Sequence, residues 1–260
     1  NSKEINMAEN QYDFPTEVLD LPSKGLLYPK DSPLSSGQIE IKYMTAKEED
    51  ILTSTNLLEK GLAISKLLES IIANPEIKLD DLLVGDKNAI MIGARILGYG
   101  KDYEISVTDP DTSLQETTVV DLTTVKNTEV DYSLLEGNEN KFSFTLPNSK
   151  KVLEFKLLTH KDEETISQTQ QALQKVNPDD TALFTSRMKH QIISVDGDTS
   201  TATINRFVDK EFLTLDTREF RKHLRKITPD VDLRFDYTSQ IGEPHKVNIP
   251  IGVTFFWPDI

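Results

Sequence analysis

Residues 39–49 read Ile-Glu-Ile-Lys-Tyr-Met-Thr-Ala-Lys-Glu-Glu, and residues 153–163 read Leu-Glu-Phe-Lys-Leu-Leu-Thr-His-Lys-Asp-Glu. The second segment follows the first at a constant spacing of 114 residues, without a gap. Identical residues alternate with positions that are apolar in both segments. This agreement predicts that the chain contains two tandem copies of one unit, and the rest of the sequence is interpreted on that basis.

The repeated segment predicts a strand followed by a capped helix. Apolar and polar residues alternate in its first part, as they do in a strand with one buried face. Thr45 then precedes a helical pattern with Glu48 three residues later, and Thr159 with Asp162 is the weaker equivalent of this capping box. Further acidic residues in the first turn suit the positive end of the helix dipole. The carboxylates here are therefore better explained by helix capping than by a metal or catalytic site.

The sequence around each segment predicts the same order of elements. The expected fold class is α+β, with two tandem related units that each contain a strand or hairpin, then helices, then a β-hairpin. In the first unit we expect helices over residues 49–56, 62–72 and 87–97, and a hairpin of residues 102–108 and 117–122. In the second unit we expect helices over residues 163–176 and 181–193, a capped helix after Asp216, and a hairpin of residues 231–237 and 247–256.

Composition predicts the borders between these units. Residues 1–20 are expected to form a flexible N-terminal arm, 21–126 the first unit, 127–140 a linker rich in polar residues, and 141–260 the second unit. The proline-rich stretch 15–33 is expected to lie extended, either on the first unit or along a neighbouring protein. Residues 1–14 carry isolated apolar anchors, which favours docking on a partner.

Charge and composition exclude several classes of function. The chain has 260 residues and no cysteine, so disulfides, thiolate zinc sites and cysteine nucleophiles are excluded. The formal charge is −14, and residues 1–150 hold 14 Lys and Arg against 26 Asp and Glu. Such a chain repels phosphate, so nucleic-acid binding is not expected. Neither a membrane span nor a signal peptide is recognised, which favours work in a cytoplasm or in a particle assembled there.

No catalytic, cofactor or metal site is predicted. A Gly-x-Ser-x-Gly motif is absent, and the four histidines stand in unrelated contexts. Asp109-x-Asp111-x-Ser113 and Asp196-x-Asp198-x-Ser200 resemble the start of a calcium loop, but both lack the glycine at position six and the acidic residue at position twelve. We interpret both as turns and do not expect the chain to be an enzyme.

Several stretches could contact other proteins. Residues 218–226 carry five positive residues and one acidic residue on a predicted helix, which fits an anion-binding or partner face or an ordinary solvated helix side. The apolar stretch from residue 249 onwards is either a last core strand or a contact patch. The candidate partner contacts are Tyr12, Phe14, Leu19, Tyr28, Phe255, Phe256 and Trp257.

Five segments together resemble the baseplate hub protein family of T-even type contractile-tailed bacteriophages. They are Leu21-Pro-Ser-Lys-Gly-Leu-Leu-Tyr-Pro, Tyr43-Met-Thr-Ala-Lys-Glu-Glu-Asp-Ile-Leu-Thr-Ser, Gly85-Asp-Lys-Asn-Ala-Ile, Arg95-Ile-Leu-Gly-Tyr-Gly and Phe255-Phe-Trp-Pro. The resemblance implies a virion structural or assembly component of the tail baseplate, assembled in the host cytoplasm. It also implies other baseplate or tail proteins as partners in a hetero-oligomeric, symmetric assembly, without nucleic acid or membrane.

The resemblance leaves a zinc site doubtful and two other functions open. Some relatives carry a Cys-Pro-x-Cys knuckle in the first hairpin, where this chain has Asp109-Pro-Asp-Thr and no thiolates. A tail-assembly chaperone that is absent from the mature virion would share this sequence. An acidic DNA-mimic inhibitor is the other alternative, although the interspersed lysines disfavour it.

Overall fold

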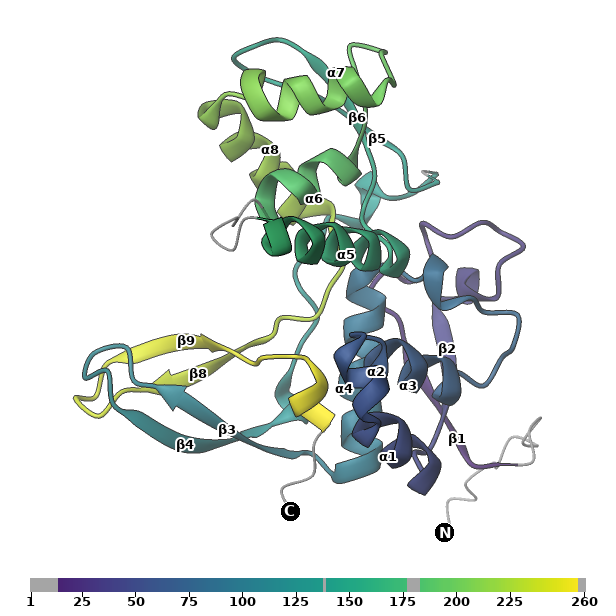
Figure 1. The fold of residues 1–260 in the computed structure, drawn as a ribbon, viewed down its shortest axis with the longest axis vertical. Coiled ribbons are helices and arrows are strands. Elements are labelled where there is room, and N and C mark those ends of the chain that lie inside the picture. The colour runs from purple at the N-terminus through teal and green to yellow at the C-terminus, as the bar shows by residue number, and fades with distance from the viewer. Residues whose placement is uncertain (1–13, 138, 177–182, 257–260) are drawn as a thin grey trace, which may run out of the picture.

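The computed structural model describes residues 14–137, 139–176 and 183–256, and it confirms the α+β fold class. Helices and short antiparallel strand pairs form two bodies, with helix α5 lying between them (Figure 1). We call residues 14–126 the first half of the chain and residues 141–256 the second half. Each half runs in the order hairpin, helices, hairpin, as the sequence predicts.

The first half begins with the antiparallel strands β1 (Thr16–Asp20) and β2 (Gln38–Lys42). Four helices follow: α1 (Ala46–Thr53), α2 (Thr55–Glu59), α3 (Ala63–Ile71) and α4 (Val84–Tyr99). The half ends with the hairpin of β3 (Asp102–Thr108) and β4 (Gln115–Asp121). Residues 16–20 therefore form a strand, although their composition suggested a flexible arm, because the alternating residues of β2 give them a partner with a matching register.

The second half begins with β5 (Phe142–Thr145) and β6 (Val152–Phe155), which pair with β7 (Ile192–Val195) in one sheet. Its helices are α5 (His160–Val176), α6 (Leu183–Gln191), α7 (Thr201–Arg206), a π-helical turn (Phe207–Glu211) and α8 (Thr214–Ile227). The hairpin of β8 (Arg234–Thr238) and β9 (Pro244–Asn248) follows, and a 3₁₀ turn (Val253–Phe256) ends the described chain.

Three details of the second half differ from the sequence prediction. The helix expected to reach residue 193 ends at Gln191, because the β-branched residues after it form β7 and pair with β6. Helix α7 was not predicted. The strand expected over residues 247–256 ends at Asn248, and a 3₁₀ turn replaces its last part.

The two quoted segments have the same local structure, as predicted. In each, a strand leads into a helix that starts one residue after the threonine: α1 at Ala46 and α5 at His160. The Thr45 backbone N–H donates to Glu48 Oε2 at 2.8 Å, and the Thr159 N–H donates to Asp162 Oδ2 at 3.0 Å. Both capping pairs are thus formed. That the halves arose by duplication stays a prediction.

A second shared device was not recognised in the sequence. The third residue of the last helix of each half, Asp86 in α4 and Asp216 in α8, is fully buried and accepts hydrogen bonds from that half's first hairpin loop. Asp86 accepts from the Ser23 N–H at 2.9 Å and from the Tyr28 hydroxyl at 2.6 Å. Asp216 accepts from the Asn148 N–H at 2.8 Å and from the neighbouring Ser149 N–H at 3.0 Å. The donors follow the matching dipeptides Leu-Pro at 21–22 and 146–147.

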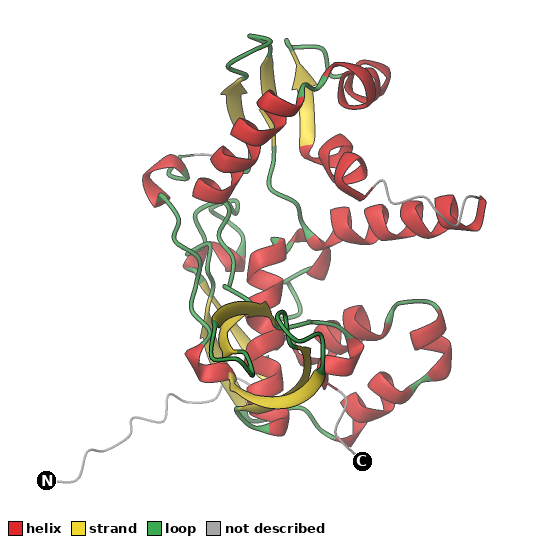
Figure 2. Cartoon of the chain, turned by 90° about the vertical axis from the view of Figure 1, so that its left-hand side faces the viewer, coloured by secondary structure: helices red, strands yellow, loops and turns green. Residues whose placement is uncertain are grey.

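The last hairpin of the chain packs on the first half. Strands β8 and β9 lie beside β3 and β4, and these hairpins project together from the molecule (Figures 1 and 2). The Tyr237 hydroxyl donates to Asp109 Oδ2 at 3.0 Å, and the Gln240 N–H donates to the same oxygen at 2.8 Å. Asp109 also accepts from the N–H groups of its own turn, which confirms the turn interpretation of this sequence. Residues of the β3–β4 and β8–β9 hairpins therefore complete one another's hydrogen bonds.

The expected linker is packed rather than free. The Asp232 N–H donates to Lys126 O at 2.7 Å, and the Thr128 N–H donates to Asp230 O at 2.8 Å. Further along, Leu135 is fully buried, and the Tyr132 hydroxyl donates to Pro22 O at 2.8 Å. These contacts hold the connecting residues against both halves, so the two halves are not joined by a free linker.

Candidate partner-binding site at the joint between the halves

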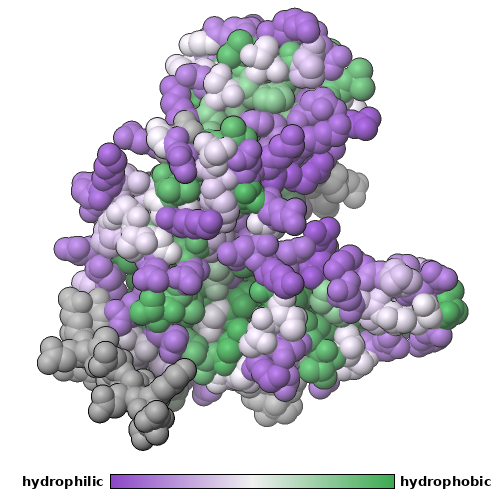
Figure 3. Space-filling model, turned by 180° about the vertical axis from the view of Figure 1, so that it is seen from behind, coloured by the Kyte–Doolittle hydropathy of each residue, from purple (hydrophilic) through white to green (hydrophobic). Residues whose placement is uncertain are grey.

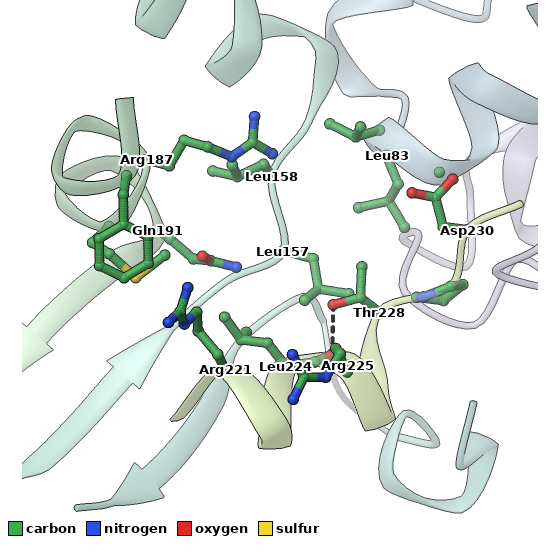
Figure 4. A pocket seen from close by; sticks show the side chains of 15 residues that line it. Leu83, Leu157, Leu158, Arg187, Gln191, Arg221, Leu224, Arg225, Thr228 and Asp230 are labelled. Carbon is green, nitrogen blue, oxygen red and sulfur yellow. Dashed lines mark hydrogen bonds between the residues drawn. The ribbon is translucent and has the colours of Figure 1, made fainter. Parts of the chain in front are cut away.

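A pocket of about 310 Å³ lies where the two halves meet (Figure 4). Its apolar wall combines Leu83 at the start of α4 with Leu157 and Leu158, which connect β6 to α5. Those three leucines are almost completely buried, and Leu83 and Leu157 belong to the continuous core. Helix α6 supplies Met188, and helix α8 supplies Leu224. The pocket therefore depends on both halves being docked.

Three arginines surround the opening of this pocket, which we call the arginine-rimmed pocket. They are Arg187 of α6 with Arg221 and Arg225 of α8, and Figure 4 shows them around the same hollow. Arg187 reaches Glu163 at 3.5 Å, and the Arg221 guanidinium lies 5.1 Å from the centre of the Phe184 ring. Within the described ranges, neither α8 arginine makes an ion pair. The rim is therefore a concentration of positive charge on an acidic protein.

Gly85 explains why the pocket forms at this place. A Cβ atom at residue 85 would lie 1.9 Å from the Pro229 carbonyl oxygen, closer than any side chain tolerates. The backbone of the segment after α8 can thus approach the start of α4 only because residue 85 is glycine. The nearby Asn88 side chain donates to Asp230 at 3.0 Å and fixes this approach. Burial raises the pKa of the Asp230 carboxyl, although the Asn88 hydrogen bond opposes that shift.

A charged cluster beside the pocket joins α4 to α5. The Lys87 ammonium forms an ion pair with Glu163, and Arg187 adds a second, longer contact. Burial alone would raise the pKa of Glu163, but the charge of Lys87, with a contribution from Arg187, lowers it below its ordinary value. Glu163 therefore stays ionised and offsets part of the positive charge of the rim.

A neighbouring hollow of about 650 Å³ contains Ser65, His160 and Glu164 in mutual contact. Ser65 Oγ lies 3.1 Å from His160 Nε2 and donates to Glu164 Oε1 at 2.7 Å. Glu164 Oε1 is also 3.3 Å from that same Nε2, whereas the buried Nδ1 has no hydrogen-bond partner among the described residues. A catalytic triad requires the carboxylate and the hydroxyl on opposite ring nitrogens. This cluster is therefore arranged as a packing contact between α3 and α5 and lacks the geometry of an activated nucleophile.

The structure divides the predicted contact residues into different classes. Tyr12 and Trp257 lie outside the described residues. Phe14 is half-buried, and the Lys42 ammonium lies 4.7 Å from the centre of its ring. The Phe14 side chain is therefore associated with β2 of its own first half.

The other candidate contact residues pack inside the protein, which is one of the two alternatives that the sequence left open for these stretches. Leu19 is half-buried and lies against the backbone of α4 at Gly93. Tyr28 is buried, and its hydroxyl donates to Asp86. Both Phe255 and Phe256 are fully buried. The apolar C-terminal stretch thus serves the protein's own core in this structure. A role of these residues in contacts with a partner stays a prediction.

The basic stretch of α8 was recognised in the sequence, but the pocket was not. Phe184 and Arg187 are separated from it by about thirty residues, and no local pattern shows that α6 and α8 face one another. Over the part of the chain that the structure describes, no three His, Asp or Glu side chains are grouped to hold a metal ion. No described helix is long and apolar enough to span a bilayer.

One of three comparisons with known proteins supports the resemblance to phage baseplate proteins seen in the sequence. The comparison with curated proteins and the comparison with solved structures each returned no significant match. The model of a protein family described as T4 bacteriophage base plate protein matches residues 20–257. This match covers both halves, the joint between them and the arginine-rimmed pocket. The chain therefore belongs to the T4 bacteriophage base plate protein family.

Proposed function

We propose that this protein is a non-enzymatic structural or assembly component of the hub region of a contractile-tail baseplate, and that it acts through contacts with other baseplate or tail proteins. The family match carries this proposal, because it assigns nearly the whole described chain to a baseplate protein. The arginine-rimmed pocket supports it with a preformed, charged recess of the kind that accepts a segment of another chain.

The surface of the molecule supports a role in protein contacts rather than in catalysis. The paired hairpins project from the body, and the end of this projection carries apolar residues (Figure 3). Leu114 and Ile241, in the two turns, are 57% and 66% exposed. A protruding tip with exposed aliphatic side chains suits insertion into a neighbouring protein. The cluster of Ser65, His160 and Glu164 has the wrong geometry for nucleophilic catalysis.

A tail-assembly chaperone that leaves before maturation is the second candidate. It would use the same contacts, and it differs only in whether the protein remains in the particle. The acidic DNA-mimic function is less well supported, because the cations of α8 interrupt any continuous acidic surface.

Purified particles can distinguish the first two functions. We expect mass spectrometry of washed phage tails to contain the chain, and a phage that lacks its gene to accumulate tails without complete baseplates. Absence of the chain from finished tails, together with the same assembly defect, would establish the chaperone instead. Normal baseplates in the gene deletion would contradict both.

A further inference from the structure

The last helices of the two halves share three equivalent positions. The buried anchors Asp86 and Asp216 are the third residues of α4 and α8. Four positions after each anchor lies a core residue, and nine positions after it lies an arginine, Arg95 in α4 and Arg225 in α8. Nine residues along a helix turn by about half a revolution, so both arginines point away from the hairpin that the anchor binds.

In the first half, the chain's own C-terminal segment covers this face of the helix. Arg95 is 8% exposed, and its Nε donates to the Phe255 carbonyl oxygen at 3.0 Å. The Phe255 ring packs edge-on against Tyr103, with the ring centres 4.9 Å apart. The first half therefore shows what this face can bind: a short segment that offers a backbone carbonyl to the arginine and an aromatic side chain beside it.

In the second half, the equivalent face is open within the described structure. Arg225 and Arg221 are exposed and line the arginine-rimmed pocket, where no described segment occupies the position that Phe255 has in the first half. The apolar wall at Leu157 and Leu224 continues below the arginines. An apolar recess under a cationic rim is therefore present where the first half has a bound segment.

We propose that this recess binds an acidic segment of a partner protein, with an aromatic or aliphatic side chain in the pocket and carboxylates on Arg221 and Arg225. This inference rests on the proposed function and names the chemistry of the partner. Arginine binds carboxylates through paired, charge-assisted hydrogen bonds, and a second guanidinium beside it excludes a basic partner. Phe184 stacks on Arg221 and holds that guanidinium at the edge of the recess.

Nucleic acid fits the same cations less well. The chain carries a net charge of −14, which repels a long polyanion over most of its surface. The recess is also small and has an apolar wall, which suits a side chain but gives no row of cations to follow a phosphate backbone. A short acidic peptide in the recess meets three arginines against one lining carboxylate, Asp230, so the positive charge is in excess there.

The test measures binding of two labelled probes to the full chain by fluorescence anisotropy. The first probe is a short peptide that alternates Glu with Phe, and the second is a single-stranded oligonucleotide of similar charge. We expect the peptide to bind, and the variants Arg221→Glu and Arg225→Glu to weaken it at least about tenfold each. The matched control is Arg218→Glu, which reverses an exposed charge on the same helix outside the recess and should change binding by less than about twofold.

Three outcomes would overturn the inference: no binding of the peptide to the wild-type chain, equal weakening by Arg218→Glu and Arg225→Glu, or tighter binding of the oligonucleotide than of the peptide. A third probe, a peptide that alternates Lys with Phe, should not bind the wild-type protein but should bind the Arg221→Glu/Arg225→Glu double variant. Such binding would show that the variant is still folded although it no longer binds the acidic peptide. Failure of peptide binding by a protein that is present in purified baseplates would reject this inference and leave the proposed function intact. Peptide binding by a protein that is absent from finished tails would support this inference and reject the proposed function as a component of the finished baseplate.

Discussion

Asp86 and Asp216 occupy equivalent places in the two halves, yet the pKa values of their carboxyl groups are shifted in opposite directions. Burial raises the pKa of Asp86 above its ordinary value, even though Ser23 and Tyr28 donate to it. Burial also disfavours the charged form of Asp216, but the N–H groups of Asn148 and Ser149 outweigh it and lower its pKa. Both anchors are fully buried, but Asp216 binds a turn at the surface, where Asn148 is exposed, whereas Asp86 binds donors that are buried. A shared backbone plan does not impose a shared electrostatic environment.

Removing the anchors should give the largest difference in stability between the two halves. Asp86→Ala leaves the Ser23 and Tyr28 donors buried without a partner, and we expect it to lower the free energy of unfolding by about 3–5 kcal/mol. Asp216→Ala should cost less, about 1–2 kcal/mol, because water can reach the turn at 148–149. Urea denaturation of both variants measures the difference. An equal cost would show that the two environments are alike after all.

The second residues of α4 and α8, Gly85 and Leu215, should also differ in how much a change to alanine lowers the free energy of unfolding. Gly85→Ala places a methyl group against the Pro229 carbonyl, and we expect a loss of about 2–3 kcal/mol because one backbone must move. The equivalent residue of α8 is Leu215, which is 60% exposed, so Leu215→Ala should change stability by less than about 0.5 kcal/mol. Thermal unfolding of the pair tests this. A harmless Gly85→Ala would mean that the joint between the halves is loosely packed.

The two threonine caps should behave alike. Thr45→Ala and Thr159→Ala should each cost about 0.5–2 kcal/mol. Each partner carboxylate also has a second contact, since Glu48 accepts from the Ser70 hydroxyl at 2.6 Å and Asp162 pairs with Lys156 at 2.7 Å. Denaturant midpoints of the two single variants provide the measurement. A cap effect in only one half would weaken the structural equivalence on which the duplication rests.

The contributions of Asp86 and Asp216 to the free energy of unfolding should change with pH in opposite directions. Asp216 has a lowered pKa in the folded state, so its contribution is present above the ordinary value of 3.8 and is lost as pH falls below it. Asp86 has a raised pKa, so it favours the folded state more as pH falls toward 3.8. Relative to Asp216→Asn, wild type should therefore lose its advantage with acidification, whereas relative to Asp86→Asn it should gain. Unfolding curves between neutral and acidic pH measure both slopes, and slopes of the same sign would reject the assignment.

Local signals in the sequence predicted the local structure well. The capping boxes at Thr45 and Thr159 and the turn at Asp109 are formed as predicted, because each depends on residues within about four positions of one another. The alternation of residues 102–108 likewise gave β3 its observed bounds.

Features that depend on distant contacts were not predictable in the same way. Strand β7 exists because β6 offers it an edge, and the recognition of Asp86 by Ser23 joins residues far apart in the sequence. The candidate site lies between these cases. The cations of α8 are visible in the sequence, whereas their assembly with Arg187 into a recess depends on how α6 packs. The burial of Phe255 was one of two alternatives and was decided by the face of α4 that Arg95 occupies.

The return of the last hairpin to the first half has a consequence for synthesis on the ribosome. Strands β8 and β9 and the turn at Phe255 are made more than a hundred residues after the α4 face and the β3–β4 hairpin that they cover. The first half therefore emerges with Arg95 and the Tyr103 ring uncovered, and it stays incomplete until residues 234–256 have left the ribosome. Contacts of such long sequence separation slow folding, because a large loop must close before they form. The nascent first half is thus the stage at which this protein is most open to capture by a chaperone or by a premature partner.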